Sequence, residues 1–356
     1  SGELVLNSRI RVRIDYRETA QPSAARSLVA ADAAAAGPRA LAWAPPASNP
    51  AYKILVSDEG IYRMNKAWLD ARGIDLSGAA LNRIRMYNRG REIAIRIDDQ
   101  GIANQLDGSD YIEFYGQPVA APETKYTPYN VYWLTDAGVP GGLRMAAVDG
   151  TPASAPVPAT HTATVQYEKD EYYIGLAPGA DALDRWFFAT FVLGSGFTGG
   201  GAPVPADFTL ALPDVAGTMS GDLKISLFGF YDTDHEVAVA VNGTPVGTYT
   251  WSGIAYHEVT IANVALLDGN NTVTLQCNSG TDPLDPDGIL VDWFQTTYDR
   301  GFAARGNTLK FSYDTGSRHQ ISGFAGASGN DLAVYDITAP DAVRQVDNGV
   351  ITGADP

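Results

Sequence analysis

Alternation of apolar with polar residues, the period of a half-buried β-strand, recurs along this chain and limits its fold more than any other feature. The clearest alternating segments span residues 223–227, 237–241, 273–277 and 289–293. The chain is also rich in glycine (37), proline (21) and tyrosine (18), which suit strands joined by tight turns. The sequence therefore predicts an all-β protein with little helix.

Two turn sequences adjoin these alternating segments. Asn242-Gly243 directly follows one segment, and Asp268-Gly269 comes shortly before the next. Asn, Asp and Gly accept the positive φ angles that tight hairpins need. Because regularly spaced strands joined by such turns are typical of a sandwich, we expect a β-sandwich over residues 166–300.

The length of 356 residues exceeds the size at which one hydrophobic core usually keeps growing, so several domains are expected. Stretches rich in Ala and Pro, with little periodicity, indicate linkers between them. The expected parts are a leading strand with an Ala/Pro-rich linker (1–50), a small β-rich N-terminal domain (51–145), a linker (146–165), the sandwich (166–300), and C-terminal strands with a connection toward a missing domain (301–356).

Three local patterns near the start of the chain give specific expectations. Residues 9–16 alternate charged with apolar side chains and predict a strand. Residues 52–62 contain two short apolar runs around a turn and predict a β-hairpin. Residues 65–73 predict a helix of about two turns, with Asn65 capping its first amides and Gly73 in the left-handed closing position.

The charge balance narrows the range of partners. The 25 basic and 41 acidic residues give a net charge of −16, which repels phosphate backbones and anionic lipids, so we expect no nucleic-acid partner. No run approaches the roughly 20 apolar residues that span a bilayer. The sequence begins at Ser1, without an initiator Met or signal peptide. We therefore expect that an upstream segment was removed and that the protein is secreted or lies at the cell surface.

Clusters of carboxylates in turns suit calcium, because hard divalent cations take oxygen ligands. The candidate metal ligands are Asp232, Asp234, Glu236, Asp282, Asp285 and Asp287. His235 lies inside the first cluster and is a candidate ligand-binding residue. A solvated turn with local hydrogen-bonded caps explains the first cluster equally. The second cluster does not have the spacing of an EF-hand loop, and proline-rich acidic turns are common at protein surfaces.

Two explanations fit the aromatic side chains: a surface on which sugars stack, and a packed core. Trp251 follows a hairpin strand and is the better candidate for exposure, so it is the second candidate ligand-binding residue, for a glycan. Trp186, Phe187 and Phe188 can be explained by core packing. Trp293 continues the inward parity of its strand, which predicts that it is buried.

The single cysteine, Cys277, excludes an intramolecular disulfide and a zinc site of clustered Cys and His. It shares the inward parity of Val273 and Leu275, which predicts a buried core thiol. No base lies near it in the sequence, and no two of the 41 acidic residues stand out as a catalytic pair. We therefore expect no catalytic residue in this chain and no enzyme activity of its own.

Short motifs spread over residues 52–345 carry a resemblance to a known family. They are residues 57–63 (SDEGIYR), 87–90 (YNRG), 108–116 (GSDYIEFYG), 130–134 (NVYWL), 290–294 (LVDWF), 298–300 (YDR) and 333–340 (AVYDITAP). The chain resembles the region that precedes the catalytic domain in gingipain-type cysteine peptidases, among them the sortase of the type IX secretion system. The catalytic His-Gly segment and cysteine of that family have no counterpart here, so the resemblance implies a cysteine peptidase only for the parent protein.

Residues 205–300 also resemble a galactose-binding-like jelly roll, a module that often binds sugars and holds a structural calcium. Three functions follow from the two resemblances. The first is an accessory or pro-region that packs against, or presents, the missing peptidase domain of the same precursor. The second is a carbohydrate-binding or adhesion module, with glycans as partners. The third is a structural subunit of a surface assembly, joined through strand edges.

Overall fold

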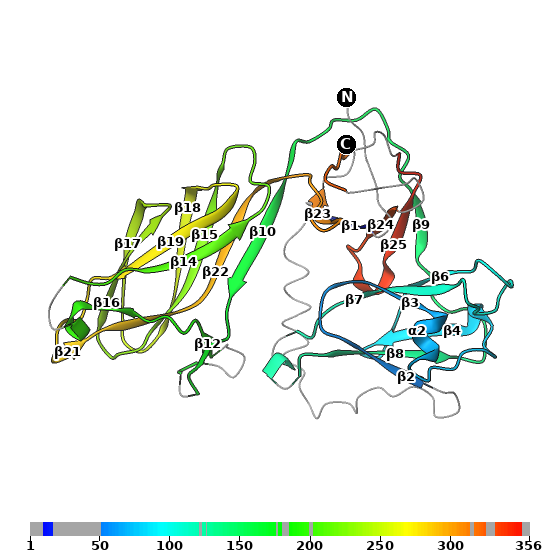
Figure 1. The fold of residues 1–356 in the computed structure, drawn as a ribbon, viewed down its shortest axis with the longest axis horizontal. Helices are drawn as coiled ribbons and strands as arrows, with labels where there is room; N and C mark the ends of the chain where they lie inside the picture. Colours follow the sequence, from blue (N-terminus) through cyan, green and yellow to red (C-terminus); the bar gives the residue numbers. More distant parts are fainter. Residues whose placement is uncertain are drawn as a thin grey trace. The chain divides into compact units, whose positions relative to one another are not determined.

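The computed structural model describes residues 10–16, 51–120, 123–125, 127–175, 177–179, 185–198, 202–313, 317–324 and 332–350. Nearly all regular structure in these ranges is β-strand, which confirms the predicted all-β class (Figure 1). The chain divides into two compact units. Pro158–Ala303 form the sandwich unit, and Ser1–Val157 together with Ala304–Pro356 form the discontinuous unit. No helix in the described ranges is long and apolar enough to cross a bilayer.

The sandwich unit consists of two antiparallel sheets with one core between them. The first sheet has the order β10 (Thr160–Glu168), β22 (Gly288–Gly301), β15 (Ser220–Gly229) and β18 (Tyr256–Ala265), with β13 (Val192–Leu193) also paired to β22. The second has the order β14 (Ala206–Leu212), β19 (Gly269–Cys277), β16 (Asp234–Val241) and β17 (Thr244–Ser252). Two short hairpins complete the unit, β11 (Tyr172–Tyr173) with β12 (Trp186–Phe187) and β20 (Thr281–Asp282) with β21 (Asp285–Pro286).

The alternating segments face this core as predicted. The apolar positions of residues 223–227, 237–241 and 273–277 are all buried in one cluster. Each fully buried Val or Leu side chain contributes about 1.5–3 kcal/mol relative to an exposed one. Asn242 and Gly243 both have positive φ, 49° and 78°, and join β16 to β17 as the predicted hairpin.

Trp293 departs from the predicted inward parity. The register between β15 and β22 shifts between Ser226 and Leu227, which leaves Asp292 as an extra residue in β22. A bulge of this kind changes the face to which the following side chains point. Trp293 is therefore only half-buried, whereas Phe294 is fully buried in the core.

The discontinuous unit contains two small antiparallel sheets. The first has the order β2 (Ala51–Val56), β8 (Asn130–Asp136), β4 (Ile84–Asn88) and β5 (Arg91–Ile93). The second has the order β3 (Gly60–Asn65), β7 (Tyr111–Gly116) and β6 (Ile95–Asp98). Both sheets contribute to one apolar core. The predicted hairpin at residues 52–62 is wrong, because β2 pairs with β8 and β3 pairs with β7, so the chain changes sheets at the turn.

The helix predicted at residues 65–73 is confirmed as α2 (Lys66–Asp70). The Asn65 side chain accepts a hydrogen bond from the Trp68 amide at 2.8 Å, and Gly73 has a φ of 68°. Short 3-10 helices are η1 (Leu81–Arg83), η2 (Glu123–Lys125), η3 (Ser195–Thr198) and η4 (Pro340–Ala342).

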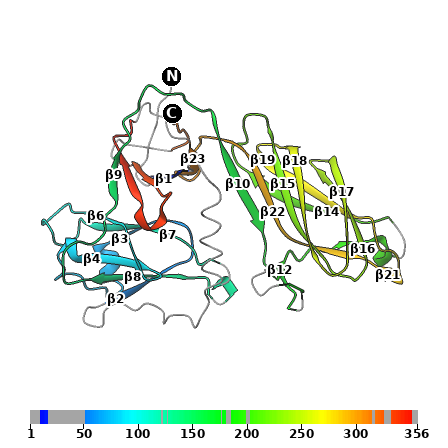
Figure 2. The ribbon, with the colours of Figure 1, turned by 180° about the vertical axis from the view of Figure 1, so that it is seen from behind.

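A third sheet in the discontinuous unit joins segments from distant parts of the sequence (Figure 2). Its order is β23 (Thr308–Tyr313), β1 (Ile10–Tyr16), β24 (Leu332–Asp336), β25 (Arg344–Asp347) and β9 (Ala146–Asp149). The structure thus groups residues differently from the expected parts. The expected linker 146–165 contains β9 and the start of β10, and the C-terminal strands expected within 301–356 are β23, β24 and β25 of this sheet. The Ala/Pro-rich residues 17–50 lie outside the described residues.

Candidate functional site

The six candidate metal ligands do not come together. Asp232, Asp234, Asp282 and Asp285 are exposed, and Asp287 is completely buried. Three of the six have local partners: Ser252 Oγ donates to Asp234 at 2.5 Å, Asn278 Nδ2 donates to Glu236 at 3.1 Å, and the Leu284 amide donates to Asp282 at 2.9 Å. No group of three or more His, Cys, Asp or Glu side chains in the described residues is placed to hold a metal ion.

Asp287 instead forms the centre of a buried polar network in the sandwich unit. Its carboxylate accepts hydrogen bonds from His235 Nδ1 at 2.7 Å and from Ser279 Oγ at 2.5 Å, and the Cys277 thiol lies 3.3 Å from Oδ2. His235 and Asp287 are 1% and 0% exposed. We call His235, Cys277, Ser279 and Asp287 the His235–Asp287 network.

The geometry assigns a positive charge to His235. Its Nδ1 faces the Asp287 carboxylate, and its Nε2 lies 3.0 Å from the carbonyl oxygen of Gly253. Both oxygens can only accept, so both ring nitrogens must carry a proton. The Trp251 ring stacks on the imidazole with a centroid distance of 4.8 Å, and the far face of Trp251 stacks on His257 at 4.8 Å. Trp251 is therefore half-buried between two imidazoles, and neither candidate ligand-binding residue presents a free ring face.

The backbone around this network requires glycine at two positions. A Cβ on Gly229 would lie 2.2 Å from His235 Nε2. A Cβ on Gly280, which has a φ of 60°, would lie 2.0 Å from the Asp287 amide nitrogen. Both approaches are closer than van der Waals contact allows, so the network is packed into the sandwich without spare volume.

Charge and hydrogen bonding shift the pKa values of both His235 and Asp287. Burial lowers the pKa of His235, but the hydrogen bond and charge of Asp287 and the Gly253 carbonyl raise it more, so the pKa lies above its ordinary value. Burial raises the pKa of Asp287, but hydrogen bonds from His235 and Ser279 lower it more, so this pKa lies below its ordinary value. Each shift favours the charged form of its group, in agreement with an ion pair between His235 and Asp287.

Stability should depend on pH through this pair. The raised pKa of His235 contributes stability that is complete below its unfolded pKa, about 6.5, and is lost as pH rises through the folded pKa. The lowered pKa of Asp287 contributes stability that is present above about pH 3.9 and is lost as pH falls through the folded pKa. We expect the free energy difference between the native chain and a His235→Gln/Asp287→Asn variant to be greatest between these limits. Urea unfolding from pH 3 to 9 measures it, and a pH-independent difference would contradict the assignment.

Cys277 is a buried core thiol, as predicted. Burial raises its pKa to about 12, and the adjacent Asp287 carboxylate adds to the shift. Cysteine, histidine and aspartate do meet here, but Asp287 bonds to both of the others and His235 directs its second nitrogen to a carbonyl. We expect a thiol reagent to label Cys277 only after unfolding. Labelling of the native chain at the rate of a free thiol would show that the site opens.

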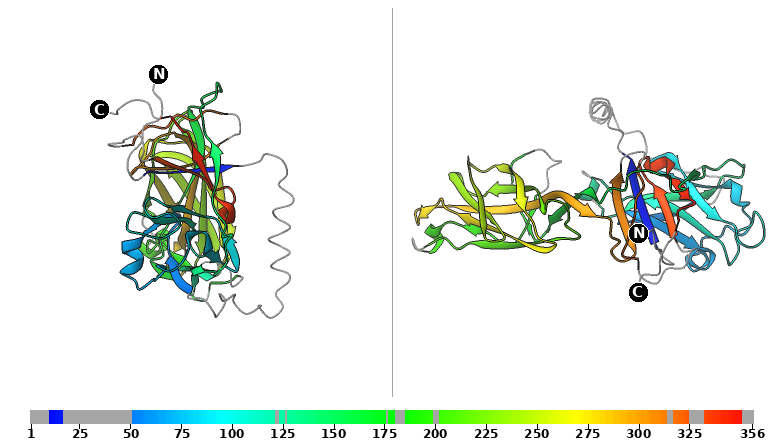
Figure 3. Two further views of the ribbon diagram at one scale, coloured as in Figure 1. Left: turned by 90° about the vertical axis from the view of Figure 1, so that its right-hand side faces the viewer. Right: turned by 90° about the horizontal axis from the view of Figure 1, so that it is seen from above.

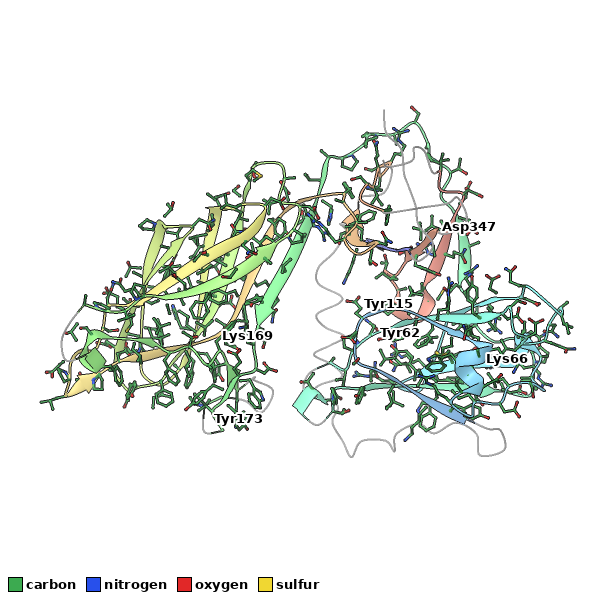
Figure 4. All side chains as sticks on the ribbon, viewed as in Figure 1. Tyr62, Lys66, Tyr115, Lys169, Tyr173 and Asp347 are labelled. Carbon is green, nitrogen blue, oxygen red and sulfur yellow. The ribbon has the colours of Figure 1, made fainter. Side chains whose placement is uncertain are left out.

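A different surface of the sandwich unit exposes aromatic rings. Tyr172, Tyr173 and Trp186 on the β11–β12 hairpin are 39%, 54% and 40% exposed. Figure 4 labels Tyr173 of this hairpin. Tyr173 and Trp186 pair across the two strands with ring centroids 5.0 Å apart. Phe187, the neighbour of Trp186, is completely buried and anchors the hairpin. We call Tyr172, Tyr173 and Trp186 the hairpin aromatics. In the sequence, the adjacent residues Tyr172 and Tyr173 were the signal that could have indicated this surface. Their strand is too short to show an alternating pattern.

The discontinuous unit contains a second buried charge that sequence reasoning missed. Glu113 on β7 is 2% exposed and accepts hydrogen bonds from Arg63 Nε at 2.7 Å, Arg96 at 3.0 Å and the Tyr335 hydroxyl at 2.5 Å. The Arg63 guanidinium also lies over the Tyr111 ring at 4.0 Å. Because Tyr335 belongs to β24, this network joins the third sheet to β3, β6 and β7.

Apolar contacts reinforce the same junction. Ile61 and Tyr115 from the small sheets pack with Tyr335, Ile337 and Val343 from the C-terminal part of the chain. Tyr115, labelled in Figure 4, belongs to this second core, whereas Tyr62 on the neighbouring strand stacks on Phe114 in the first core. The junction is therefore a second core between segments more than 200 residues apart in sequence.

The chain is similar to known proteins in fold but not in sequence. No family model and no curated protein matches the chain. The crystal structure of dimeric latent PorU from Porphyromonas gingivalis matches with 15% identity and a TM-score of 0.58, and covers 87% of this chain. This chain spans only 30% of the PorU chain.

Two carbohydrate-binding modules match a smaller part of the chain. The CBM35 from Cellvibrio japonicus Abf62 has 15% identity and a TM-score of 0.26, and the match covers 39% of this chain and 97% of that module. The CBM36-1 domain of a multidomain xylanase from the hindgut metagenome of Trinervitermes trinervoides has 19% identity and a TM-score of 0.24, covering 38% and 95%. Of these three comparisons the one with PorU alone exceeds a TM-score of 0.5. The chain is thus similar in fold to a part of PorU, over more residues than either of its two units contains.

Proposed function

We propose that this chain is a non-catalytic accessory region of a larger gingipain-like cysteine peptidase that is secreted or lies at the cell surface. Its work is to pack against the peptidase domain of the same precursor or to present it. The observation that carries the proposal is the extent of the likeness to PorU, 87% of this chain, which includes parts of both units. The motifs spread over residues 52–345 point to the same family.

The buried chemistry agrees with a role without catalysis. Cys277 has a raised pKa and no imidazole oriented to remove its proton. Glu113 is neutralised by two arginines. Both groups stabilise the fold, so peptide hydrolysis is assigned to the rest of the precursor.

Association with the peptidase domain tests the proposal. The peptidase domain encoded by the same gene is produced separately, mixed with this chain and studied by calorimetry. We expect a one-to-one complex with a Kd of about 1 µM or tighter, which corresponds to about −8 kcal/mol. A gene that encodes no such domain, or no association at about 100 µM, would rule the proposal out.

The hairpin aromatics favour a second candidate function, carbohydrate binding or adhesion. Three exposed rings on one short hairpin offer apolar faces of the kind on which pyranose rings stack, and Lys169 and Glu171 lie nearby as an ion pair at 3.5 Å. This location replaces Trp251, both of whose faces are covered by imidazoles.

Substitutions in the β11–β12 hairpin distinguish carbohydrate binding from the accessory function. A Tyr173→Ala/Trp186→Ala variant should lose glycan retention on an immobilised polysaccharide panel by more than tenfold, with an unchanged melting temperature. Tyr129→Ala is the matched control, because Tyr129 is 44% exposed and lies in the other unit. If native chain and variant bind every glycan equally, the sugar function is excluded. If the variant retains glycan binding but no longer binds the peptidase domain, the hairpin contributes to the accessory function.

A further inference from the structure

The strand β1 occupies an unusual place in the third sheet. It lies between β23 and β24 and runs parallel to both (Figure 3). Arg11 to Tyr16 pair in register with Thr308 to Tyr313, and Ile10 to Ile14 pair with Leu332 to Asp336. A segment from the start of the sequence therefore fills a slot between two strands from its end.

The slot must be filled for this sheet to exist. Neighbouring strands lie about 4.8 Å apart, so β23 and β24 are separated by two such spacings and cannot bond directly to each other across the slot. Without β1, one edge of each strand would lose its backbone partners. Each lost hydrogen bond destabilises the sheet, and an unpaired edge favours pairing with another chain.

The connection of β1 to the rest of the chain is long. Residues 17–50, 34 in all, separate β1 from β2. Fully extended, such a segment spans up to about 110 Å. That reach is several times the width of a small domain, so β1 can enter the slot of its own chain or of a neighbour without changing any contact inside the sheet.

Charge does not oppose entry of this strand into a second copy. Residues 10–16 contain two arginines and one aspartate, whereas the chain as a whole has a net charge of −16. Two intact copies therefore repel each other, but the exchanged strand does not share their excess of negative charge.

We propose that the slot between β23 and β24 is a strand-acceptor site for residues 10–16, and that a second copy of this chain can supply the strand to form an exchanged dimer. A long connection gives the chain's own β1 an effective concentration of about 1 mM or less. The intramolecular arrangement therefore predominates at micromolar concentration, and the exchanged dimer becomes abundant as the protein concentration approaches that value.

A disulfide trap in the full-length chain tests the proposal. Arg11→Cys with Thr308→Cys joins residues that pair in register, where neighbouring Cα atoms lie about 4.8 Å apart, within disulfide reach. Arg11→Cys with Lys310→Cys is the control, because Lys310 pairs with residue 13 and its Cα lies about 8 Å from that of residue 11. An equal mixture of 15N-labelled and unlabelled chains is refolded at about 1 µM and at about 1 mM, oxidised, and weighed by mass spectrometry.

The expected result is a disulfide within one chain at the low concentration and mixed-isotope disulfide dimers at the high one, with at least tenfold less cross-link in the control. Disulfides only within one chain at both concentrations would overturn strand exchange. Absence of the Thr308 cross-link, or equal cross-linking of the control, would overturn the acceptor slot itself.

Discussion

Replacing Asp287 by alanine should lower the free energy of unfolding by about 3–5 kcal/mol, because it leaves the His235 imidazolium buried without its counter-ion. His235 and Asp287 are 1% and 0% exposed, so neither can recover the lost interaction from water without opening the sandwich. The Ser279 hydroxyl would also lose its acceptor. Urea unfolding of the full chain, followed by tryptophan fluorescence, measures the effect.

Matched variants identify its cause. Asp285→Asn changes an exposed carboxylate two residues away and should alter stability by less than about 0.5 kcal/mol. Asp287→Asn retains an acceptor oxygen but removes the charge. Its loss of unfolding free energy should therefore lie between those of Asp287→Ala and Asp285→Asn. Loss of less than about 1 kcal/mol in Asp287→Ala would show that His235 is neutral in the folded chain and that its assignment as an imidazolium is wrong.

Replacing Glu113 by alanine should cost a similar amount, about 3–5 kcal/mol, in the discontinuous unit. The substitution leaves Arg63 and Arg96 as neighbouring cations without their shared carboxylate and removes the acceptor of the Tyr335 hydroxyl. Since Tyr335 lies on β24, we also expect the C-terminal strands to become sensitive to limited proteolysis. Urea unfolding and mass mapping of the cleavage sites give the two measurements.

The control for Glu113 is an ion pair at the surface. Lys66 and Asp70 are bonded at 2.7 Å one helical turn apart, and Asp70 is exposed. Such pairs contribute about 0.3–0.5 kcal/mol, so Asp70→Asn should be almost neutral. Tyr335→Phe removes one hydrogen bond and should cost about 1 kcal/mol. Equal effects of Glu113→Ala and Asp70→Asn would mean that the network does not hold the C-terminal strands.

The predicted strands and the faces of their side chains could be derived from the sequence because side chains on a strand alternate with a period of two residues. Val237 and Leu275 are buried as their parity predicts. The prediction failed for Trp293, since the extra residue Asp292 arises from the register with a neighbouring strand. The candidate metal ligands show a related limit of local patterns: Asp285 and Asp287 are two residues apart in sequence, but Asp285 is exposed and Asp287 is buried.

The sequence by itself determined the all-β class, the alternating segments that become strands of the sandwich, the capped helix at Asn65 and the burial of Cys277. Only the tertiary structure decided which strands are neighbours. Strands are joined by backbone hydrogen bonds, which are the same for every residue type except proline, so a local pattern shows the face of a strand and not its partner. The insertion of β1 between β23 and β24 follows from that choice of partners. The hydrogen bonds between His235 and Asp287, 52 residues apart, and between Glu113 and Tyr335, 222 residues apart, also follow from it.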